Sequence, residues 1–253
     1  MMPKPIEPSL KALFDEGYVQ RRLTLSVFDR DYLHFADLAE LIRRVSKEVK
    51  GLIFDYGSGG APYAPLFSHC AGYVAGDLEA GPRVDRVLKP DGMTNELDNA
   101  FDFVLSTQVL EHVKNPHLYL RECYRILRPG GRILLSTHGM FVEHGCPHDY
   151  RRWTARGLEE LFIETGFQIN QSGKLTTQIR GMVQVMNMFA VYLQCPNRRF
   201  LNFVFLVVRK LYFKAFMPML HKFADLFVEQ TIVEASASDC IYVVVFVKAQ
   251  KPS

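Results

Sequence analysis

A short apolar segment followed at once by a glycine-rich turn constrains the fold of this chain more than any other feature. Ile53 and Phe54 have the character of a buried strand, and residues 55–60 read Asp-Tyr-Gly-Ser-Gly-Gly. Glycine permits positive φ values and lets a ligand approach the backbone without a Cβ in the way. Because Pro62 suits the first position of a helix, the stretch predicts a strand, a turn and a helix, an arrangement that holds nucleotides.

Two acidic residues strengthen this interpretation. Asp55 stands two residues before Gly57, and Asp77 closes the next apolar segment, 72–76. An acid about 20 residues beyond the turn, at the end of the second strand, is where nucleotide folds hold a ribose diol. Pro62 occupies the place of the third glycine of an NAD-binding G-x-G-x-x-G motif, and residues 55–63 contain no Lys or Arg for a phosphate. The first feature disfavours NAD as the ligand, and the second disfavours ATP.

The turn and the two acids resemble the cofactor half of the class I S-adenosylmethionine (SAM) methyltransferases, whose first strand ends in an acid-x-Gly-x-Gly motif. Residues 101–106 (Phe-Asp-Phe-Val-Leu-Ser), 109–113 (Val-Leu-Glu-His-Val) and 127–136 (Leu-Arg-Pro-Gly-Gly-Arg-Ile-Leu-Leu-Ser) are similar to the fourth and fifth motifs of the same enzymes, notably the branch related to quinone-methylating enzymes. Residues 138–154 are similar to a subgroup often found among bacterial glycan and polysaccharide methyltransferases. Together these matches span about residues 50–170.

The resemblance implies SAM as the cofactor. It places the cofactor contacts at Asp55, Gly57, Gly59, Asp77, Leu78, Asp91, Gly92, Thr107 and Gln108. Members of the family commonly carry an acid-bearing segment after the third strand for the adenine amine, and only Asp91 in Pro-Asp-Gly fits that description here.

Alternating strand and helix patterns predict a doubly wound, mostly parallel sheet of seven strands, the Rossmann-like methyltransferase fold, with a helical insertion before the last strand. Strands are expected up to residue 54 and near 72–77, 84–88, 101–107, 132–137, 168–175 and 241–249, with helices after Asp31 and at 62–70, 116–127 and 154–166. We interpret 1–253 as a single methyltransferase domain. Its expected parts are an N-terminal helical segment (1–48), a cofactor-binding core (49–175), a helical basic and apolar insertion or lid (176–238), and a last strand with its tail (239–253).

Composition limits the class of protein and its compartment. With 253 residues, 48% of them hydrophobic, the chain can bury a full core. Its five cysteines form no C-x-x-C pair, and the N-terminal residues contain no apolar signal region. Reduced thiols and a cytoplasmic location are therefore expected.

The charge of the chain is unevenly distributed. Between Thr165 and Ala224 there is no Asp or Glu but there are eight Lys or Arg, so this stretch carries +8 and leaves −5 on the remainder of a chain of net charge +3. Phe200 to Val208 is apolar, yet Arg209 and Lys210 end it well short of the ~20 residues that cross a bilayer. Two interpretations stay open: basic helices that contact an anionic membrane at its inner surface or cover a lipid-bearing substrate, and a lid that packs on the domain. No nucleic-acid motif is present, and no nucleic-acid partner is expected.

Four histidines are the candidate catalytic bases. Methyl transfer to a hydroxyl requires positioning of the acceptor and removal of its proton, and histidine is the natural base near neutral pH. His148, supported by Asp149, is the first candidate, with His138 and His112 next and His144 nearby. Each is alternatively a packed or solvated loop histidine.

Residues around His148 are candidates for substrate and metal binding. We expect Asp149, Tyr150, Arg151 and Arg152 to contact the substrate, because guanidinium groups and aromatic planes hold carboxylates, phosphates and sugar faces. His138, His144, Cys146, His148 and Asp149 offer metal-binding atoms, but their spacing matches no standard zinc motif, and we expect no metal.

The sequence thus predicts a SAM-dependent methyltransferase that methylates oxygen on a glycan or other polar small molecule, with a lipid-linked acceptor as one option. Carbon methylation of a quinone-like acceptor is an alternative that needs less of a base. A SAM- or nucleotide-binding partner subunit without catalysis is a further alternative.

Overall fold

A computed structural model describes residues 15–145, 148–192, 194, 197–238 and 240–253. One eight-stranded sheet runs through it in the order β3-β2-β1-β4-β5-β8-β6-β7. The strands are β1 (Leu52–Tyr56), β2 (Gly72–Asp77), β3 (Arg86–Val87), β4 (Phe101–Thr107), β5 (Leu127–His138), β6 (Gln168–Thr177), β7 (Ile232–Glu234) and β8 (Tyr242–Gln250). Strands β1 to β5 pair in parallel, and β8 lies antiparallel between β5 and β6. The predicted doubly wound, mostly parallel fold is confirmed.

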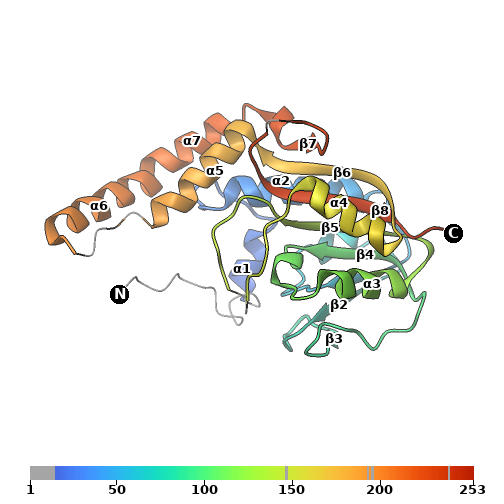
Figure 1. Cartoon of the computed structure of the whole chain (residues 1–253). Coiled ribbons are helices and arrows are strands. Elements are labelled where there is room, and N and C mark those ends of the chain that lie inside the picture. Colours follow the sequence, from blue (N-terminus) through green and yellow to red (C-terminus); the bar gives the residue numbers. More distant parts are fainter. Residues whose placement is uncertain (1–14, 146–147, 193, 195–196, 239) are drawn as a thin grey trace.

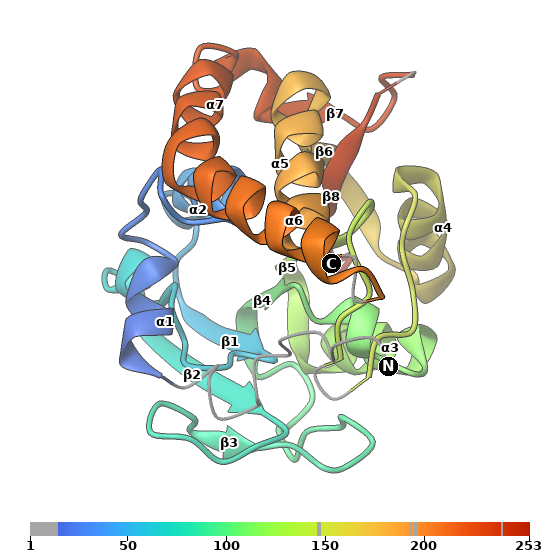
Figure 2. The same cartoon turned by 90° about the vertical axis from the view of Figure 1, so that its left-hand side faces the viewer.

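Helices cover both faces of the sheet (Figures 1 and 2). They are α1 (Glu16–Arg21), α2 (Tyr32–Ser46), α3 (Pro116–Ile126), α4 (Ala155–Thr165), α5 (Gln178–Val191), α6 (Arg199–Leu211) and α7 (Met217–Ala224), with a π-helical segment at Tyr212–Phe216 and short 3₁₀ segments at Ala64–Phe67, Leu110–His112 and Val228–Gln230. Successive strand residues point to opposite faces, so each strand contributes to two cores.

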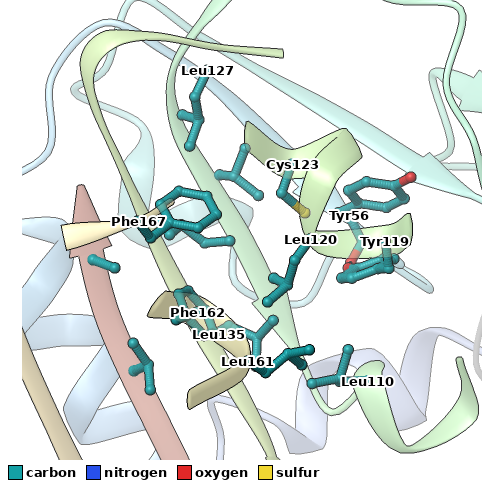
Figure 3. Close-up of a cluster of buried hydrophobic side chains, with 14 of the residues drawn as sticks. Tyr56, Leu110, Tyr119, Leu120, Cys123, Leu127, Leu135, Leu161, Phe162 and Phe167 are labelled. Atoms are coloured by element: carbon teal, nitrogen blue, oxygen red, sulfur yellow. The ribbon is translucent and has the colours of Figure 1, made fainter. Parts of the chain in front are cut away.

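The two cores lie on either side of the sheet. Figure 3 shows part of the first, in which Leu120 of α3 and Phe162 of α4 pack against the sheet. The second holds Leu38 and Ile42 of α2 against residues such as Phe103 on the other face of β4. The sheet is therefore buried on both sides, as a parallel sheet requires, and the carboxyl ends of its strands open to one edge.

Two sequence-based expectations need correction. The sheet has an eighth strand, β7, because Ile232–Glu234 pairs antiparallel with Gly173 to Leu175 of β6. Three residues are too few to show a period of two, so the sequence pattern carried no signal for it. The helix expected at 62–70 is only the 3₁₀ segment Ala64–Phe67, and Pro65 lacks the N–H group that a helix begun at Pro62 would use at that position.

The expected ends of α4 are confirmed. Thr154 caps the helix, since its Oγ accepts a hydrogen bond from the Gly157 N–H at 3.0 Å. Gly166 follows the last turn with φ +96°, the left-handed conformation that glycine adopts at little cost.

The insertion before β8 forms a helical arm, which we define as α5, α6, the π-helical segment and α7. Figure 1 shows α6 and α7 running back along α5, with the far end of the arm projecting beyond the sheet. No helix among the described residues is long and apolar enough to span a membrane.

A buried ion pair joins the arm to the body of the protein. Arg180 of α5 contacts Asp37 of α2 with 2.5 Å between Nη2 and Oδ1, and both side chains are almost fully buried. The same guanidinium donates to the Ala224 carbonyl and lies 3.2 Å from the Asp225 carboxylate at the end of α7. Burial raises the pKa of Asp37 to about 6, so the carboxylate depends on this arginine to stay ionised at neutral pH.

Replacing Arg180 by Met should lower the free energy of unfolding by about 3–5 kcal/mol, because it leaves the Asp37 charge buried without its partner. The double variant Asp37→Leu/Arg180→Met should recover much of that loss, since apolar residues of similar volume replace a buried pair at little cost. Urea denaturation followed by circular dichroism measures both, with Arg43→Met in an exposed pair as the control. A single variant as stable as the wild type would show that the pair does not hold the arm.

Candidate functional site

A cavity of about 1340 Å³ opens at the carboxyl ends of the central strands. Its walls come from the glycine turn after β1, the end of β2, the loops after β4 and β5, helices α1 and α2, and the C-terminal half of α5. Ligand pockets usually measure about 300–1,000 Å³. The cavity is therefore large enough for a cofactor and a second molecule side by side.

The glycine turn forms one wall of this cavity and is pinned to β2. The N–H groups of Gly57 and Ser58 both donate to the Gly76 carbonyl, at 2.8 and 3.0 Å. Gly57 has φ +75°, and a Cβ on it would lie 2.5 Å from a methyl carbon of Val109. The turn therefore requires glycine at this position for both its backbone conformation and its contact with the next loop.

Asp77 stands at the rim of the turn. Its Oδ2 accepts from the Gly59 N–H at 2.7 Å, and Oδ1 accepts from the Glu79 N–H at 3.3 Å. Burial raises its pKa. Each carboxylate oxygen can accept more than one hydrogen bond, so the side chain can hold two hydroxyls of a ligand while it keeps the turn in place.

The other predicted cofactor contacts gather around the same cavity. Leu78, Asp91, Gly92, Thr107 and Gln108 all line it. Gln108 has φ +57° and donates from Nε2 to Ser136 Oγ at 3.1 Å. Its Oε1 is buried and has no hydrogen-bond partner among the described residues, which suits it to accept a hydrogen bond from a ligand. That these residues hold a cofactor stays a prediction.

Asp55 is not brought to the cavity wall. It lies in β1 on the side of the sheet away from Tyr56, and its Oδ2 accepts from the Tyr73 hydroxyl at 2.6 Å. Burial raises its pKa to about 7. The alternation of side chains along β1 causes this placement, and Tyr73 of β2 is the hydrogen-bond partner of Asp55 in the described part of the chain.

The loop after β5 and the segment after β4 bring a buried acid and histidine together. His138 Nε2 lies 3.1 Å from Oε1 of Glu111, and both side chains are buried. Thr137 Oγ1 donates to Oε2 of the same carboxyl group at 2.8 Å. Burial raises the pKa of Glu111 to about 7 and lowers that of His138 well below its usual range, so the surroundings favour the uncharged form of both groups.

Aromatic rings fix the position of His138. Its imidazole stacks on the Phe141 ring, with centroids 3.9 Å apart, and meets the edges of the His34 and His144 rings. Its Nδ1 is buried and has no hydrogen-bond partner in the described part of the chain. His138 also lines the cavity.

The other two candidate bases also line the cavity. His112 donates from Nδ1 to the His148 carbonyl at 2.6 Å, and its Nε2 lies 3.9 Å from Glu111 Oε1. The His148 ring is exposed and tilts against Tyr150, with centroids 5.7 Å apart. His148 thus supports His112 through its backbone.

The expected support of His148 by Asp149 is wrong. Oδ2 of Asp149 lies 3.3 Å from Nδ1 of His144 and accepts from the His144 N–H at 2.9 Å. Both of its oxygens also accept hydrogen bonds from Arg152. Asp149 therefore pairs with Arg152 and His144 of the same loop, and not with its sequence neighbour His148.

The four predicted substrate contacts divide into two kinds. Tyr150 and Arg151 line the cavity, although the Arg151 guanidinium donates to the carbonyls of Val113 and Lys114. Asp149 and Arg152 do not line the cavity. The Arg152 guanidinium instead donates to the carbonyls of Phe141 and Val142. The second pair therefore shapes the loop that carries His144.

Sequence reasoning missed Glu111 and His34 as site residues. Glu111 stands in the motif 109–113, but nothing in the local pattern showed that its carboxyl group would be buried beside a histidine of β5. His34 precedes Leu38 by one helical turn of α2, a spacing that places it on the buried face. Neither of its ring nitrogens has a hydrogen-bond partner among the described residues, and burial lowers its pKa to about 3.

The expectation of no metal stays a prediction. The donor set named from the sequence is only partly assembled, since Cys146 lies outside the described residues. A different set of donors is assembled in the structure. Glu111, His138 and His144 place three ligand atoms within 4.8 Å of one another. Imidazole and carboxylate are ligands for zinc and related ions.

Comparison with known proteins identifies the family. Residues 30–172, more than half of the chain, match the family model described as "Methyltransferase domain". The chain belongs to this family. The predicted class, a methyltransferase with the Rossmann-like fold, is thereby confirmed.

Individual relatives cover less of the chain. The "Ubiquinone biosynthesis O-methyltransferase" proteins of Pseudomonas aeruginosa and Pseudomonas putida are each 38% identical over 80 residues, which is 31% of this chain and 32% of theirs. The chain therefore aligns with about a third of the length of these relatives. A match over this share of the relatives does not identify a substrate.

Solved structures share the fold at low sequence identity. The [4+2]-cyclase SpnF has a TM-score of 0.55 at 18% identity, with 98% of each chain covered. The phosphoethanolamine N-methyltransferase 2 of Haemonchus contortus, solved with S-adenosyl-L-methionine, has a TM-score of 0.54 at 18% identity, covering 97% of this chain and 58% of that one. At this level of identity the likeness establishes the fold.

Replacing His34 by Phe should make stability less sensitive to acid. The folded protein holds this imidazole neutral to about pH 3, whereas the unfolded chain protonates it near pH 6.5. The unfolded state therefore binds the extra proton, and stability falls by about 1.4 kcal/mol per pH unit below pH 6.5 on account of this group. Urea denaturation at several pH values between about 4.5 and 6.5 should show a shallower decline for His34→Phe than for the wild type.

The exposed His117 supplies the control, and His117→Phe should follow the wild type. Parallel curves for His34→Phe and the wild type would show that His34 is protonated in the folded state.

Proposed function

We propose that this protein is a SAM-dependent methyltransferase that methylates a hydroxyl oxygen of a glycan or another polar acceptor, with His138 as the base. The family match supports the reaction class. The observation that carries the rest is the buried contact between His138 and Glu111 in the wall of a cavity whose opposite wall is the glycine turn. The turn follows β1 and His138 ends β5, and these two strands flank β4 in the same sheet.

The residues of the turn fit SAM. This cofactor bears a positive charge at sulfur and a ribose diol, and the turn offers carboxylate and carbonyl oxygens with no cationic side chain between residues 55 and 63. Asp77 is placed to accept from ribose hydroxyls, and the free Oε1 of Gln108 to accept from a ligand donor. Structural neighbours were solved with SAM or with S-adenosylhomocysteine, which supports the same choice.

Bound SAM supplies an electrophilic methyl group, and the chain supplies position and proton transfer. In this proposal Glu111, whose Oε1 lies 3.1 Å from Nε2 of His138, favours the tautomer with its proton on Nε2, and Nδ1 then accepts the proton of an acceptor hydroxyl. The carboxylate then stabilises the imidazolium that forms. The acceptor oxygen has to stand about 3–3.5 Å from the methyl carbon, and the cavity volume leaves room for an acceptor beside the cofactor.

The cavity wall suits a polar acceptor with a flat or ring-shaped face. Tyr150 and Trp153 line it, and Trp153 Nε1–H is buried without a hydrogen-bond partner in the described part of the chain. Aromatic faces with nearby donors bind sugar rings and also phenolic rings. The name of the Pseudomonas relatives supports the phenolic alternative, and there too oxygen is the methylated atom.

Asp77→Ala should weaken SAM binding by about 5- to 150-fold, because it removes acceptors from a partly buried site, a loss of about 1–3 kcal/mol. Isothermal titration calorimetry with SAM, S-adenosylhomocysteine and NAD tests this. The wild type should bind the first two and not NAD. Glu229→Gln, an exposed change far from the cavity, is the control. Binding of NAD alone, or of no nucleotide, would overturn the cofactor assignment.

His138→Gln should lower kcat by about 10²–10⁴-fold while leaving SAM affinity nearly unchanged, because this histidine acts on the acceptor. The wild-type rate should rise with pH through about 7, since the carboxyl group of Glu111 has to ionise to orient the imidazole. Glu111→Gln should abolish this rise of the rate with pH. The measurement is methyl transfer from labelled SAM to glycans, nucleotide sugars and phenols.

Two comparisons make the assignment specific. His148→Gln and His112→Gln should each retain more activity than His138→Gln, and full activity of His138→Gln would overturn the base assignment. Assays with a chelator and with added zinc separate proton transfer from a metal role for Glu111, His138 and His144, because loss of activity on chelation would point to the metal. A protein that binds SAM but transfers no methyl group would favour the partner-subunit alternative.

A further inference from the structure

Helix α6 leaves a stripe of apolar side chains uncovered. None of its 13 residues is buried. Phe200 is 76% exposed, Phe203 64% and Leu211 54%, with Val207 between them. These four residues follow one another at intervals of three or four, so they lie on one face of the helix. We call them the α6 stripe.

Basic residues border the α6 stripe. Arg199, Lys210 and Lys214 are exposed and fall beside it on the helical surface. No Asp or Glu occurs anywhere between Thr165 and Ala224. Within the described part of the chain, none of these three cations pairs with a carboxylate. An apolar face flanked by unneutralised cations is typical of helices that lie in the interface of an anionic membrane.

The arm is held in a position that keeps the stripe exposed. Arg209, on the opposite face of α6, donates to the Val191 carbonyl at the end of α5 at 3.0 Å. The Tyr212 hydroxyl donates to Asn187 of α5 at 2.7 Å. These two hydrogen bonds tie the arm together without using the α6 stripe, which stays uncovered in this structure. The lid interpretation of the insertion as a whole stays a prediction.

The arm is continuous with the wall of the cavity. Met188, Val191 and Tyr192, in the last turns of α5 and just beyond it, line the cavity. Helix α6 is the next helix along the chain, and its far end projects from the body of the protein (Figures 1 and 2). A surface that binds the α6 stripe would therefore lie beside the cavity.

We propose that the α6 stripe and its flanking cations dock this protein on the surface of an anionic lipid bilayer. A second copy of the chain is a poorer occupant, because it would bring the same acid-free, positively charged helix against the first. Anionic headgroups neutralise the cations, and the acyl region takes up the aromatic and aliphatic side chains. The inference does not depend on the proposed methylation; together they place the acceptor site at a membrane surface, where a lipid-borne acceptor is presented.

Vesicle flotation with the full chain tests this proposal. The wild type should float with vesicles of phosphatidylcholine containing about 30% phosphatidylglycerol and stay unbound with phosphatidylcholine alone. Binding should weaken when salt rises from about 0.1 M to about 0.5 M, because screening reduces the attraction to the surface. Lys210→Glu/Lys214→Glu and Phe200→Ser/Phe203→Ser should each lower partitioning at least tenfold.

Matched controls change charge and hydrophobicity elsewhere. Lys47→Glu/Lys50→Glu alters the net charge equally on another surface, and Leu97→Ser/Ile163→Ser removes two exposed apolar side chains outside the arm. Both should float like the wild type, and all variants should show wild-type urea denaturation. Absence of flotation, or equal loss in the control variants, would overturn the proposal. So would vesicle-independent dimers in light scattering that Phe200→Ser/Phe203→Ser abolishes, since a second copy would then cover the stripe.

Discussion

The arrangement of the cavity depends on how the turn after β1 is tied to the end of β2. Two consecutive N–H groups, of Gly57 and Ser58, share the Gly76 carbonyl, and the Asp77 carboxylate takes the N–H of Gly59. These bonds use up the backbone donors at the start of the turn and leave oxygen acceptors at its rim. The parallel pairing of β1 with β2 and β4 sets this rim beside the residues that follow β4, so the chemistry of the cavity is fixed by sheet register.

Burial decides the character of the histidine cluster. His34, His138 and Glu111 are withdrawn from water, and in each case desolvation moves the pKa toward the uncharged form. A charged pair in that environment is costly, so burial favours a neutral imidazole beside a neutral carboxyl group. Uncharged imidazole nitrogens can either accept a proton from a hydroxyl group or bind a metal cation. Which of these two roles the cluster has depends on what enters the cavity.

Helix α6 is organised by the opposite principle, because its apolar side chains face outward, whereas α5 and α7 bury apolar residues such as Val183 and Met217. The buried pair of Arg180 with Asp37 and the polar contacts of Asn187 with Tyr212 and His221 fix the arm without using the α6 stripe. Polar anchors inside and apolar residues outside invert the usual distribution. Such an inversion is maintained in a folded protein when the outer surface meets a partner.

The sequence by itself determined the fold and most of the cavity wall. Glycine at 57 and 59, an acid at 77 and the strand at 101–107 have local consequences, since φ preference, period and turn chemistry act over a few residues, and their order fixed a parallel sheet with its ligand edge. Only the tertiary structure decided that Asp55 pairs with Tyr73 away from the cavity wall, that Asp149 pairs with Arg152 and His144, that β7 joins the sheet, and that Glu111 lies against His138 at the end of β5. Those outcomes depend on which side chains from distant segments come into contact and on how far each is buried there. A local stretch of sequence determines neither.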